Sequence, residues 1–485
     1  YVAGLSLHQA VLMGYRVYNG GALPVAGPGA LAQVIYRQYA MEPPMANALT
    51  VAGSDSVGGA GLQADLKAFE ALGVHGCSVV TCVTSQNTRG VSAIFPVPPE
   101  GVASQLRSVL EDVKLGAVKT GMLYSAEIVK VVSTQLKGVG APIVVDPVMA
   151  ATTGSDLHVE GFVDALVSRL LPMCALVTPN LAEAERLSGI KVRDERSAKR
   201  AARRIMELGP DAVLVKGGHL KGPEAADYLC WDNKVVKVAS PKLDVEVHGT
   251  GCTLASLIAG NLALGLDMEE SVRTSKSMIF KAVLAREYVG MGVPCANPLA
   301  VLRIEAQKAA MLQELEEAAS LLEETMDASL LPEVGTNMGY GVLGALGPDE
   351  VAAFDGRIVR CGTRARRIGC ARFGASKHVA RIVLAASSRD PEARCALNIK
   401  YSGDNLALCR KAKLSVASFD RAKEPRGVSS MTWGVLDAID RRGSVPDVIF
   451  DRGGVGKEPM IRLLGRSPQE VLSKLKRIAA GRTRG

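Results

Sequence analysis

Residues Val245–Leu254 read Val-Glu-Val-His-Gly-Thr-Gly-Cys-Thr-Leu, and they constrain the fold more than any other stretch of the chain. A strand-like alternation leads into two glycines around Thr250, and the apolar run 254–266 predicts a buried helix. Free N–H groups at such a helix N-terminus, with the helix dipole behind them, form an anion site. Cys252 falls in the first helical turn, where the same field favours a thiolate. This pattern predicts phosphoryl transfer, although an ordinary strand–turn–helix junction has the same short sequence.

The composition indicates folded α/β domains. A chain of 485 residues is too long for a single core, so we expect two or three domains. Hydrophobic residues make up 48% of it, which excludes a disordered chain. Ten cysteines without a CxxC pair indicate a reducing cytoplasm rather than a disulfide framework or a zinc ribbon. Because no apolar run is long enough to span a bilayer, we expect no membrane partner.

Charge divides the chain into two parts. Residues 331–485 hold 28 Lys and Arg against 15 Asp and Glu, whereas residues 1–330 hold 29 against 34. The basic part predicts an anionic partner, and charge alone leaves nucleic acid and a phosphorylated small molecule both open. Residues 297–326 show a continuous helical pattern with one apolar face, so we interpret 296–330 as a packed helical connector that contains the domain boundary.

Residues 1–46 do not match the pattern that follows. They begin at Tyr1, are rich in Gly, Ala and Pro, and lack the basic region and cleavage site of a signal peptide. We therefore expect no signal peptide and leave this N-terminal extension unassigned, with Met41 or Met45 as the expected natural start.

From Ala48 onwards, short apolar strands alternate with helical patterns. Strands are predicted at 48–53, 77–84, 117–120, 143–146, 175–178 and 212–216, and helices at 62–72, 99–112, 125–136, 157–170 and 195–208. This alternation predicts a parallel sheet with helices on both faces. Ligands bind beyond the carboxyl ends of such strands. The informative residues at those ends are Asp55, Gln86, Asn87, Gly121, Met122, Asp146, Asn180 and Lys216.

Two glycine-rich stretches match nucleotide-binding motifs only in part. Gly59–Ala64 fits the G-x-G-x-x-A dinucleotide fingerprint, but no acidic residue ends the next strand to hold a ribose. Gly453–Lys457 is too short for a P-loop, and Glu458 stands where Ser or Thr would hold Mg²⁺. We therefore reject both assignments.

Eight motifs occur in the order and spacing of hydroxymethylpyrimidine and phosphomethylpyrimidine kinases. They are VAGSDSVGGAGLQADLKAFEALG, SQNTRGV, FPVPPE, VKTGML, VVDPVM, TPNLAEAE, VKGGH and HGTGCT. The chain from about Asn47 to Val289 thus resembles these members of the ribokinase-like superfamily, which make the pyrimidine half of thiamine. The resemblance implies a three-layer α/β/α kinase domain over residues 47–295 that uses ATP and Mg²⁺.

The resemblance also implies a pyrimidine pocket. Gln86 would pair with the aminopyrimidine edge, because an amide both donates and accepts hydrogen bonds. Asp65, Met122 and Val148 would form the rest of the pocket. The alternative for Asp65 is a helix-surface or capping carboxylate, and the alternative for Met122 and Val148 is that they only form the wall of the pocket.

The implied phosphoryl-transfer site combines several motifs. Asn180 and Glu183 form an N-x-x-E motif that organises Mg²⁺ largely through water in this superfamily. Lys216 would meet the ATP phosphates as a point charge. The backbone of Gly249, Thr250 and Gly251 would hold the charge on the transferred group. Cys252 stands where many ribokinase-like enzymes have an aspartate base.

The chain after Leu331 resembles the archaeal-type thiamine-phosphate synthase domain, which is often fused behind the pyrimidine kinase. The resemblance rests on the motifs PEVGTNMGYGV, AAFDGRIVR, FGASKHVARIVLAA and DVIFDRGGVGKEPM. It implies a second, smaller α/β domain over residues 331–485 in which Arg357 and His378 act in catalysis. Arginine suits a departing pyrophosphate, and His378 would bind phosphate or move a proton. Lys400, Asp451, Lys457 and Glu458 are weaker candidates.

We therefore interpret the chain as a bifunctional thiamine-biosynthesis enzyme. Its first domain would phosphorylate 4-amino-5-hydroxymethyl-2-methylpyrimidine and then its monophosphate, and its second would join the diphosphate to 4-methyl-5-(2-phosphoethyl)thiazole. One alternative is a C-terminal module that senses thiamine phosphate, although no DNA-binding helix-turn-helix is visible. Another is side activity as a vitamin B6 kinase. We expect small-molecule substrates, no nucleic-acid partner, a homo-oligomer and a cytoplasmic location.

Overall fold

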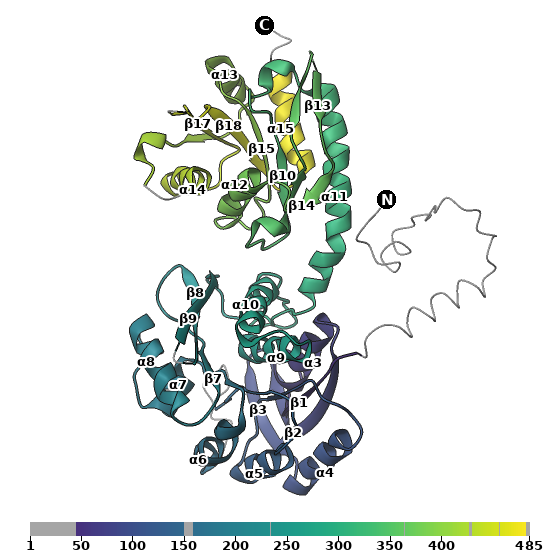
Figure 1. The fold of residues 1–485 in the computed structure, drawn as a ribbon, viewed down its shortest axis with the longest axis vertical. Coiled ribbons are helices and arrows are strands. Elements are labelled where there is room, and N and C mark those ends of the chain that lie inside the picture. Colours follow the sequence, from purple (N-terminus) through teal and green to yellow (C-terminus); the bar gives the residue numbers. More distant parts are fainter. Residues whose placement is uncertain are drawn as a thin grey trace, which may run out of the picture. The chain divides into compact units, whose positions relative to one another are not determined.

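Two sheets organise the chain in a computed structural model that describes residues 45–149, 159–232, 234–362, 364–425, 429–454 and 456–481 (Figure 1). The N-terminal extension up to residue 44 lies outside the described residues. One sheet has nine strands and the other seven.

The nine-stranded sheet lies in the N-terminal part and has the order β3-β2-β1-β4-β5-β6-β7-β8-β9. Its strands are β1 (Asn47–Ser54), β2 (His75–Asn87), β3 (Gly90–Pro96), β4 (Ala117–Thr120), β5 (Ile143–Val145), β6 (Leu176–Val177), β7 (Ala212–Val215), β8 (Glu224–Trp231) and β9 (Lys234–Pro241). The six predicted strands are present and pair in parallel. The sequence did not predict β3, β8 and β9, which pair antiparallel at the two edges and lack the continuous apolar runs of buried parallel strands.

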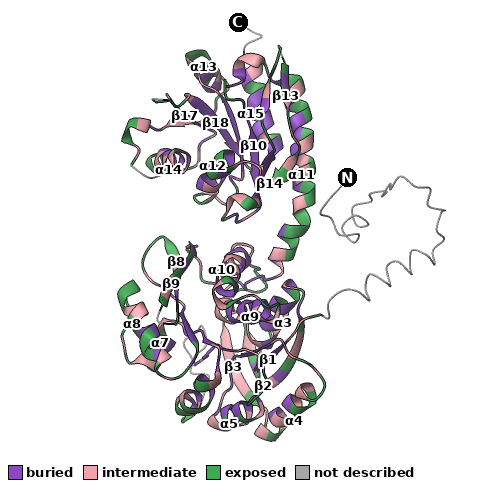
Figure 2. Cartoon of the chain, in the orientation of Figure 1, coloured by how far each residue is buried: buried purple, intermediate pink, exposed green. Residues whose placement is uncertain are grey.

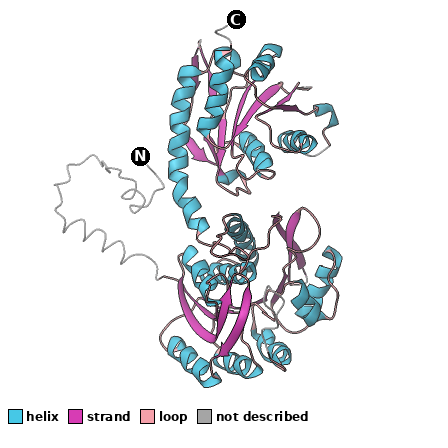
Figure 3. Cartoon of the chain, turned by 180° about the vertical axis from the view of Figure 1, so that it is seen from behind, coloured by secondary structure: helices cyan, strands magenta, loops and turns pink. Residues whose placement is uncertain are grey.

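Helices cover both faces of this sheet (Figure 3). One face carries α3 (Gly61–Ala71), α9 (Thr250–Ala263) and α10 (Met268–Leu284). The other carries α4 (Pro99–Leu110), α5 (Ala126–Gln135), α6 (Phe162–Ala165), α7 (Leu181–Ser188) and α8 (Glu195–Met206), with short helical turns at Leu166–Leu170 and Leu171–Met173. The predicted three-layer α/β/α arrangement is confirmed, with α7 and α10 added to the predicted helices. The start of the predicted helix 157–170 lies outside the described residues.

The seven-stranded sheet has the order β14-β11-β10-β15-β18-β17-β16. Its strands are β10 (Met338–Gly341), β11 (Val351–Phe354), β14 (Ala371–Phe373), β15 (Cys395–Lys400), β16 (Val416–Ser418), β17 (Val448–Asp451) and β18 (Met460–Gly465). They pair antiparallel except for β16 with β17, and β12 (Ile358–Cys361) and β13 (Arg364–Arg367) form a separate hairpin. With α12 (Lys377–Ser387), α13 (Gly403–Lys411), α14 (Ser430–Arg442) and α15 (Pro468–Ala480), this sheet makes the predicted second, smaller α/β domain.

Helix α11 (Ala300–Thr325) packs into the core of the C-terminal domain. Met311, Leu315 and Leu322 are buried among the side chains of that core, and the buried and exposed positions alternate along the helix (Figure 2). Glu316 pairs with Arg367 of the β12–β13 hairpin. The sequence predicted a connector with the boundary inside it. Because the apolar face of α11 completes the C-terminal core, we propose a boundary just before Ala300.

None of the helices in the described ranges combines the length and the apolar character needed to cross a membrane.

We predict that Leu315→Ala lowers the free energy of unfolding of the C-terminal domain by about 2–5 kcal/mol, because it removes a fully buried side chain from that core. Leu321→Ala on the same helix is the matched control, since Leu321 is 38% exposed, and it should cost less than about 1 kcal/mol. Calorimetry of the full chain measures both. Equal, small effects would show that α11 is a connector and not part of the core.

Candidate active sites

The glycine turn before α9 brings two loops into direct contact. Gly249 caps the helix with a φ of 79° and without a side-chain cap. A Cβ atom on Gly249 would lie 1.7 Å from the carbonyl oxygen of Gly59, so only glycine fits. The first amides of α9 have no intrahelical acceptor, as at any helix N-terminus. The predicted strand before the turn is not formed, because His248 makes only an isolated bridge with Cys295.

Lys216 points its ammonium group at this turn. It directly follows β7, and a Cβ atom on Gly251 would lie 3.1 Å from Lys216 Nζ. The same ammonium pairs with Asp146, with 2.7 Å between Nζ and Oδ1. Burial alone would lower the pKa of Lys216, but Asp146 and Glu183 raise it, so the side chain stays charged. A cation and a helix N-terminus therefore meet at one point.

The N-x-x-E motif forms a capping box at the start of α7. Asn180 Oδ1 accepts from the Glu183 N–H at 2.9 Å, and Glu183 Oε2 accepts from the Asn180 N–H at 2.8 Å. Burial, together with the negative charge of Asp146, raises the pKa of Glu183 to about 7 despite Lys216 nearby. The motif thus has a clear structural role at the helix start.

The same residues fit a hydrated Mg²⁺ ion. Asp146 and Glu183 bring two carboxyl groups close enough to repel each other, and the positive charge of Lys216 acts on both. A hard cation with oxygen ligands would relieve this repulsion. No cluster of three or more His, Cys, Asp or Glu side chains suited to a metal occurs in the described part of the chain.

Asp65 lies in the interior, between the sheet and α9. Lys119 Nζ donates to both of its carboxylate oxygens, at 2.9 and 2.8 Å, and neither side chain is exposed. Thr50 donates to Oδ2 at 2.6 Å and Ser256 to Oδ1 at 2.7 Å. Asp65 is therefore neither a surface nor a capping carboxylate. Both carboxylate oxygens already accept hydrogen bonds from Lys119 and from a hydroxyl group. The direct contact between Asp65 and the substrate that the sequence predicted would therefore need one of these bonds to break.

Cys252 lies above this ion pair, in the first turn of α9. Burial raises the pKa of the thiol to about 12, and Asp146 and Asp65 add to the rise, although Lys119 and the Gly61 N–H oppose it. The prediction that the helix field favours a thiolate is wrong. Here burial and the two carboxylates outweigh the helix N-terminus, so Cys252 holds its proton at neutral pH.

The predicted pocket residues lie around the end of β2. Met122 packs against Cys82 in a small apolar cluster that Val91 and Val148 also join. Gln86 is half-buried and pairs across the sheet with Val91, next to a bulge in β2. The structure thus brings Gln86, Met122 and Val148 together at one edge of the sheet.

Sequence analysis missed His248 and Lys119. Both stand inside quoted motifs, HGTGCT and VKTGML, which was the available signal. His248 Nε2 lies 3.0 Å from the terminal amide of Gln86 and 3.1 Å from Asp55 Oδ2. Asp55 in turn accepts from the amides of the Gly59 loop. His248 therefore links the pocket to the glycine loops.

Arg357 and His378 lie in the C-terminal domain. Arg357 is exposed in the turn between β11 and β12, and its guanidinium donates to the carbonyl of Val334. His378 is exposed in the first turn of α12, and the loss of part of the water around its ring, followed by the positive charge of nearby arginines, lowers its pKa to about 4. These arginines are Arg462, Arg357, Arg421 and Arg381. His378 is therefore neutral at physiological pH in a strongly positive field.

A buried carboxylate holds two of these arginines. Asp451, at the end of β17, pairs with Arg421 and with Arg462, whose Nη2 lies 2.7 Å from Oδ2. Arg462 and Asp451 are fully buried, and Arg462 Nε has no hydrogen-bond partner among the residues that the structure describes. Both guanidinium groups lie over the ring of Phe419, at 5.2 Å for Arg462 and 5.9 Å for Arg421. Asp451 is thus a structural anchor for positive charge.

The other weak candidates have distinct places. Glu458 accepts from the backbone N–H groups of Glu333 and Val334, at 2.9 and 3.3 Å, and so holds the loop to which Arg357 bonds. Lys457 pairs with Glu424, not with Glu458. Lys400 ends β15, and its carbonyl accepts from Asn405.

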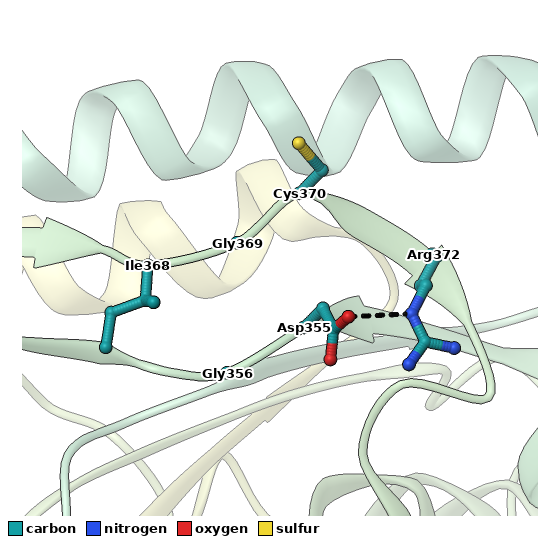
Figure 4. A pocket seen from close by; sticks show the side chains of 6 residues that line it. All are labelled: Asp355, Gly356, Ile368, Gly369, Cys370 and Arg372. Atoms are coloured by element: carbon teal, nitrogen blue, oxygen red, sulfur yellow. Dashed lines mark hydrogen bonds and ion pairs between the residues drawn. The ribbon is translucent and has the colours of Figure 1, made fainter. Parts of the chain in front are cut away.

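A shallow pocket lies beside the turn that carries Arg357. Figure 4 shows its lining: Asp355, Gly356, Ile368, Gly369, Cys370 and Arg372. Asp355 and Arg372 form an ion pair across it, with 3.1 Å between Oδ2 and Nε. Neither Arg357 nor His378 lines this pocket.

Comparison with known proteins assigns each domain. The phosphomethylpyrimidine kinase family matches residues 55–297, and the family described as thiamine-phosphate synthase ThiN matches residues 314–477. The bifunctional thiamine biosynthesis protein ThiDN of Methanocaldococcus jannaschii is 34% identical over 432 residues, which are 88% of this chain and 97% of that protein. A hydroxymethylpyrimidine/phosphomethylpyrimidine kinase of Streptomyces coelicolor is 47% identical over 50% of this chain and 91% of its own length.

Solved structures agree with the fold of the first domain. The pyridoxal kinase of Staphylococcus aureus, solved with AMP-PCP and pyridoxal, matches with a TM-score of 0.51 and 31% identity over 54% of this chain and 96% of that chain. Together with the family matches, this similarity confirms the ribokinase-like fold. The chain therefore belongs to the family of bifunctional thiamine-biosynthesis enzymes in which a phosphomethylpyrimidine kinase domain precedes a thiamine-phosphate synthase domain.

Proposed function

We propose that the N-terminal domain transfers a phosphoryl group from ATP to 4-amino-5-hydroxymethyl-2-methylpyrimidine and then to its monophosphate. The observation that carries this proposal is the position of Lys216 Nζ beside the N-terminus of α9, at the edge of the sheet that also holds Gln86. Anion-binding groups and a polar pocket at one sheet edge suit a phosphorylated donor and a small acceptor.

In the first reaction the substrate hydroxyl oxygen, and in the second a phosphate oxygen of the monophosphate, bonds to the γ-phosphorus as the bond to the ADP oxygen breaks. The backbone amides of Thr250 and Gly251 and the ammonium of Lys216 stabilise the charge on the transferred group. The hydroxyl proton passes to the phosphoryl oxygens, because Cys252 holds its own proton at neutral pH and would accept another only as a thiolate. Since such transition states are loose, positioning and charge contribute more than the base.

We also propose that Mg²⁺ accompanies ATP and is organised by Asn180 and Glu183, largely through water. The carboxyl groups of Asp146 and Glu183 support this proposal. When bound, the ion would neutralise phosphate charge. The capping box would hold Glu183 in place.

For the C-terminal domain we propose the condensation that forms thiamine phosphate. The thiazole nitrogen forms a bond to the pyrimidine methylene carbon as the carbon–oxygen bond breaks and pyrophosphate leaves. The arginines around His378 support this role, because guanidinium groups bind phosphates through paired hydrogen bonds. Arg357 would contact the diphosphate, and neutral His378 would accept or donate a hydrogen bond there.

A second substrate of the kinase domain is favoured by its structural similarity to a pyridoxal kinase. We propose side activity on a vitamin B6 alcohol, which a coupled ADP-release assay would measure. We further propose a cytoplasmic location. We also propose that the chain forms a homo-oligomer, and sedimentation of the purified chain would test this oligomeric state.

We predict that Gln86→Ala raises KM for the pyrimidine far more than KM for ATP. Loss of the amide leaves the buried aminopyrimidine edge unpaired, at a cost of about 1–3 kcal/mol, or roughly 5- to 150-fold. Titration of each substrate against ADP release measures the two constants. Equal losses for both substrates would place Gln86 outside the pocket.

We predict that Cys252→Ala lowers kcat of the kinase by about 10²–10⁴-fold if Cys252 serves as the base, which requires that it loses its proton to a thiolate when the substrates bind. Cys252→Asp should retain more activity than Cys252→Ala, because it supplies the carboxylate of the wider superfamily. Wild-type turnover in Cys252→Ala would leave the backbone amides as the catalytic element.

The raised pKa of Cys252 has a test of its own. Iodoacetamide should modify Cys252 more slowly than the exposed Cys361 and Cys370, which peptide mapping measures.

We predict that Arg357→Ala and His378→Ala abolish thiamine phosphate formation while kinase activity of the same chain is retained as the internal control. Inorganic pyrophosphate should raise the pKa of His378 above about 4, because it neutralises the surrounding arginines. An NMR titration of the ring, assigned with His378→Asn, follows this shift. A folded chain that binds thiamine phosphate but forms none would favour the sensing alternative.

A further inference from the structure

The Gln86 amide is held on both sides by groups that the proposed function has not used. On one side is His248 Nε2, 3.0 Å from the amide, and on the other is Thr84 Oγ1, 3.2 Å from it. Amide oxygen and nitrogen look alike in size, so their orientation follows from what the neighbours donate and accept. The hydrogen-bond inventory around Gln86 leaves a single consistent orientation.

The His248 side is fixed by Asp55. Asp55 accepts from the N–H groups of Val57, Gly59 and Ala60, at 3.0, 3.0 and 2.8 Å. Although burial would raise it, the pKa of Asp55 is lowered by these bonds and by His248, so the group is an ionised acceptor. His248 Nε2 lies 3.1 Å from Asp55 Oδ2 and must therefore carry a proton. A protonated Nε2 has no lone pair with which to accept from an N–H group, so the neighbouring amide atom of Gln86 has to be the oxygen, which shares the Nε2 proton with Asp55.

The Thr84 side gives the same answer independently. A threonine hydroxyl has one proton, and Thr84 Oγ1 lies 2.9 Å from the carbonyl oxygen of Ser54, which can only accept. Thr84 therefore donates to Ser54 and can only accept from Gln86. The amide atom that faces Thr84 must be the NH₂ group.

We propose that His248 and Thr84 are specificity-determining residues that lock the Gln86 amide with its oxygen toward His248 and its NH₂ group toward Thr84. One oxygen lone pair and one N–H then remain for the substrate, in a fixed order. This inference rests on the proposed function, in which Gln86 recognises the pyrimidine.

The fixed order selects one kind of ring edge. A 4-aminopyrimidine presents an amino donor beside the N3 acceptor, which matches an amide acceptor beside an amide donor. The 4-oxo analogue presents an acceptor beside N3–H, which opposes the locked amide at both atoms. Because mismatched polar groups are left unpaired in the pocket, the wild-type enzyme should discriminate strongly against the 4-oxo ring. A freely rotating amide would accept either ring.

The experiment compares kcat/KM for 4-amino-5-hydroxymethyl-2-methylpyrimidine with that for its 4-oxo analogue in the full-length chain. His248→Leu and Thr84→Val each remove one anchor, and each should lower the amino-to-oxo ratio by about tenfold or more, with KM for ATP unchanged. His248→Gln keeps an N–H donor and should restore most of the ratio. His75→Leu, at an exposed position at the start of β2, is the matched control and should leave the ratio unchanged.

Either folded variant decides the proposal. A ratio that stays at the wild-type value in His248→Leu or in Thr84→Val, with activity lost equally on both rings, would overturn it and reduce these residues to structural supports. The proposed function fails in a different way. If Gln86→Ala leaves the use of the aminopyrimidine unchanged, then Gln86 is not the recognition residue, whatever the ratio in the other variants.

Discussion

The kinase domain depends on the buried ion pair between Asp65 and Lys119. The pair joins four elements, because Thr50 of β1 and Ser256 of α9 also bond to Asp65 of α3, while Lys119 belongs to β4. Loss of one partner of such a pair typically costs about 3–5 kcal/mol, since it leaves an uncompensated charge in the interior. The bond to Ser256 sets α9 against the sheet. It thereby sets where the N-terminus of α9, with Gly251 and Cys252, meets Lys216.

The same construction recurs in the C-terminal domain. Asp451 is fully buried and fixes Arg421 and Arg462 from two elements, as Asp65 fixes Lys119. Glu458 acts on the backbone, holding the loop whose Val334 carbonyl accepts from Arg357. In both domains, carboxylates that do not need to touch substrate keep cations in place. Pre-organised charge of this kind costs little reorganisation during the reaction.

Sequence patterns predicted where the residues of the site lie better than they predicted the protonation, hydrogen bonding and packing of those residues. The parallel strands are apolar runs, so their ends, and with them Asp146, Asn180 and Lys216, could be located from the sequence. The edge strands β3, β8 and β9 lack such runs and were missed. Three features depend on packing that no motif encodes: the raised pKa of Cys252, the occupied carboxylate of Asp65 and the docking of α11 in the C-terminal core. The two residues of the N-x-x-E motif form a capping box, and the same two residues would organise a metal ion. Sequence alone could therefore not separate the two roles.

The uneven charge of the chain corresponds to two ways of handling phosphate. At the glycine turn before α9, the positive charge of Lys216 is balanced by the carboxyl groups of Asp146 and Glu183, so the cluster has little net positive charge. Under the proposed function, such a site would bind phosphates through backbone amides and would draw further positive charge from an ion that arrives with ATP. Around His378, four arginines stand close together and Asp451 balances only part of their charge. That excess suits a leaving pyrophosphate, and it keeps His378 neutral. These four arginines are part of the basic composition of residues 331–485, and under the proposed function they would provide the counter-charge for pyrophosphate.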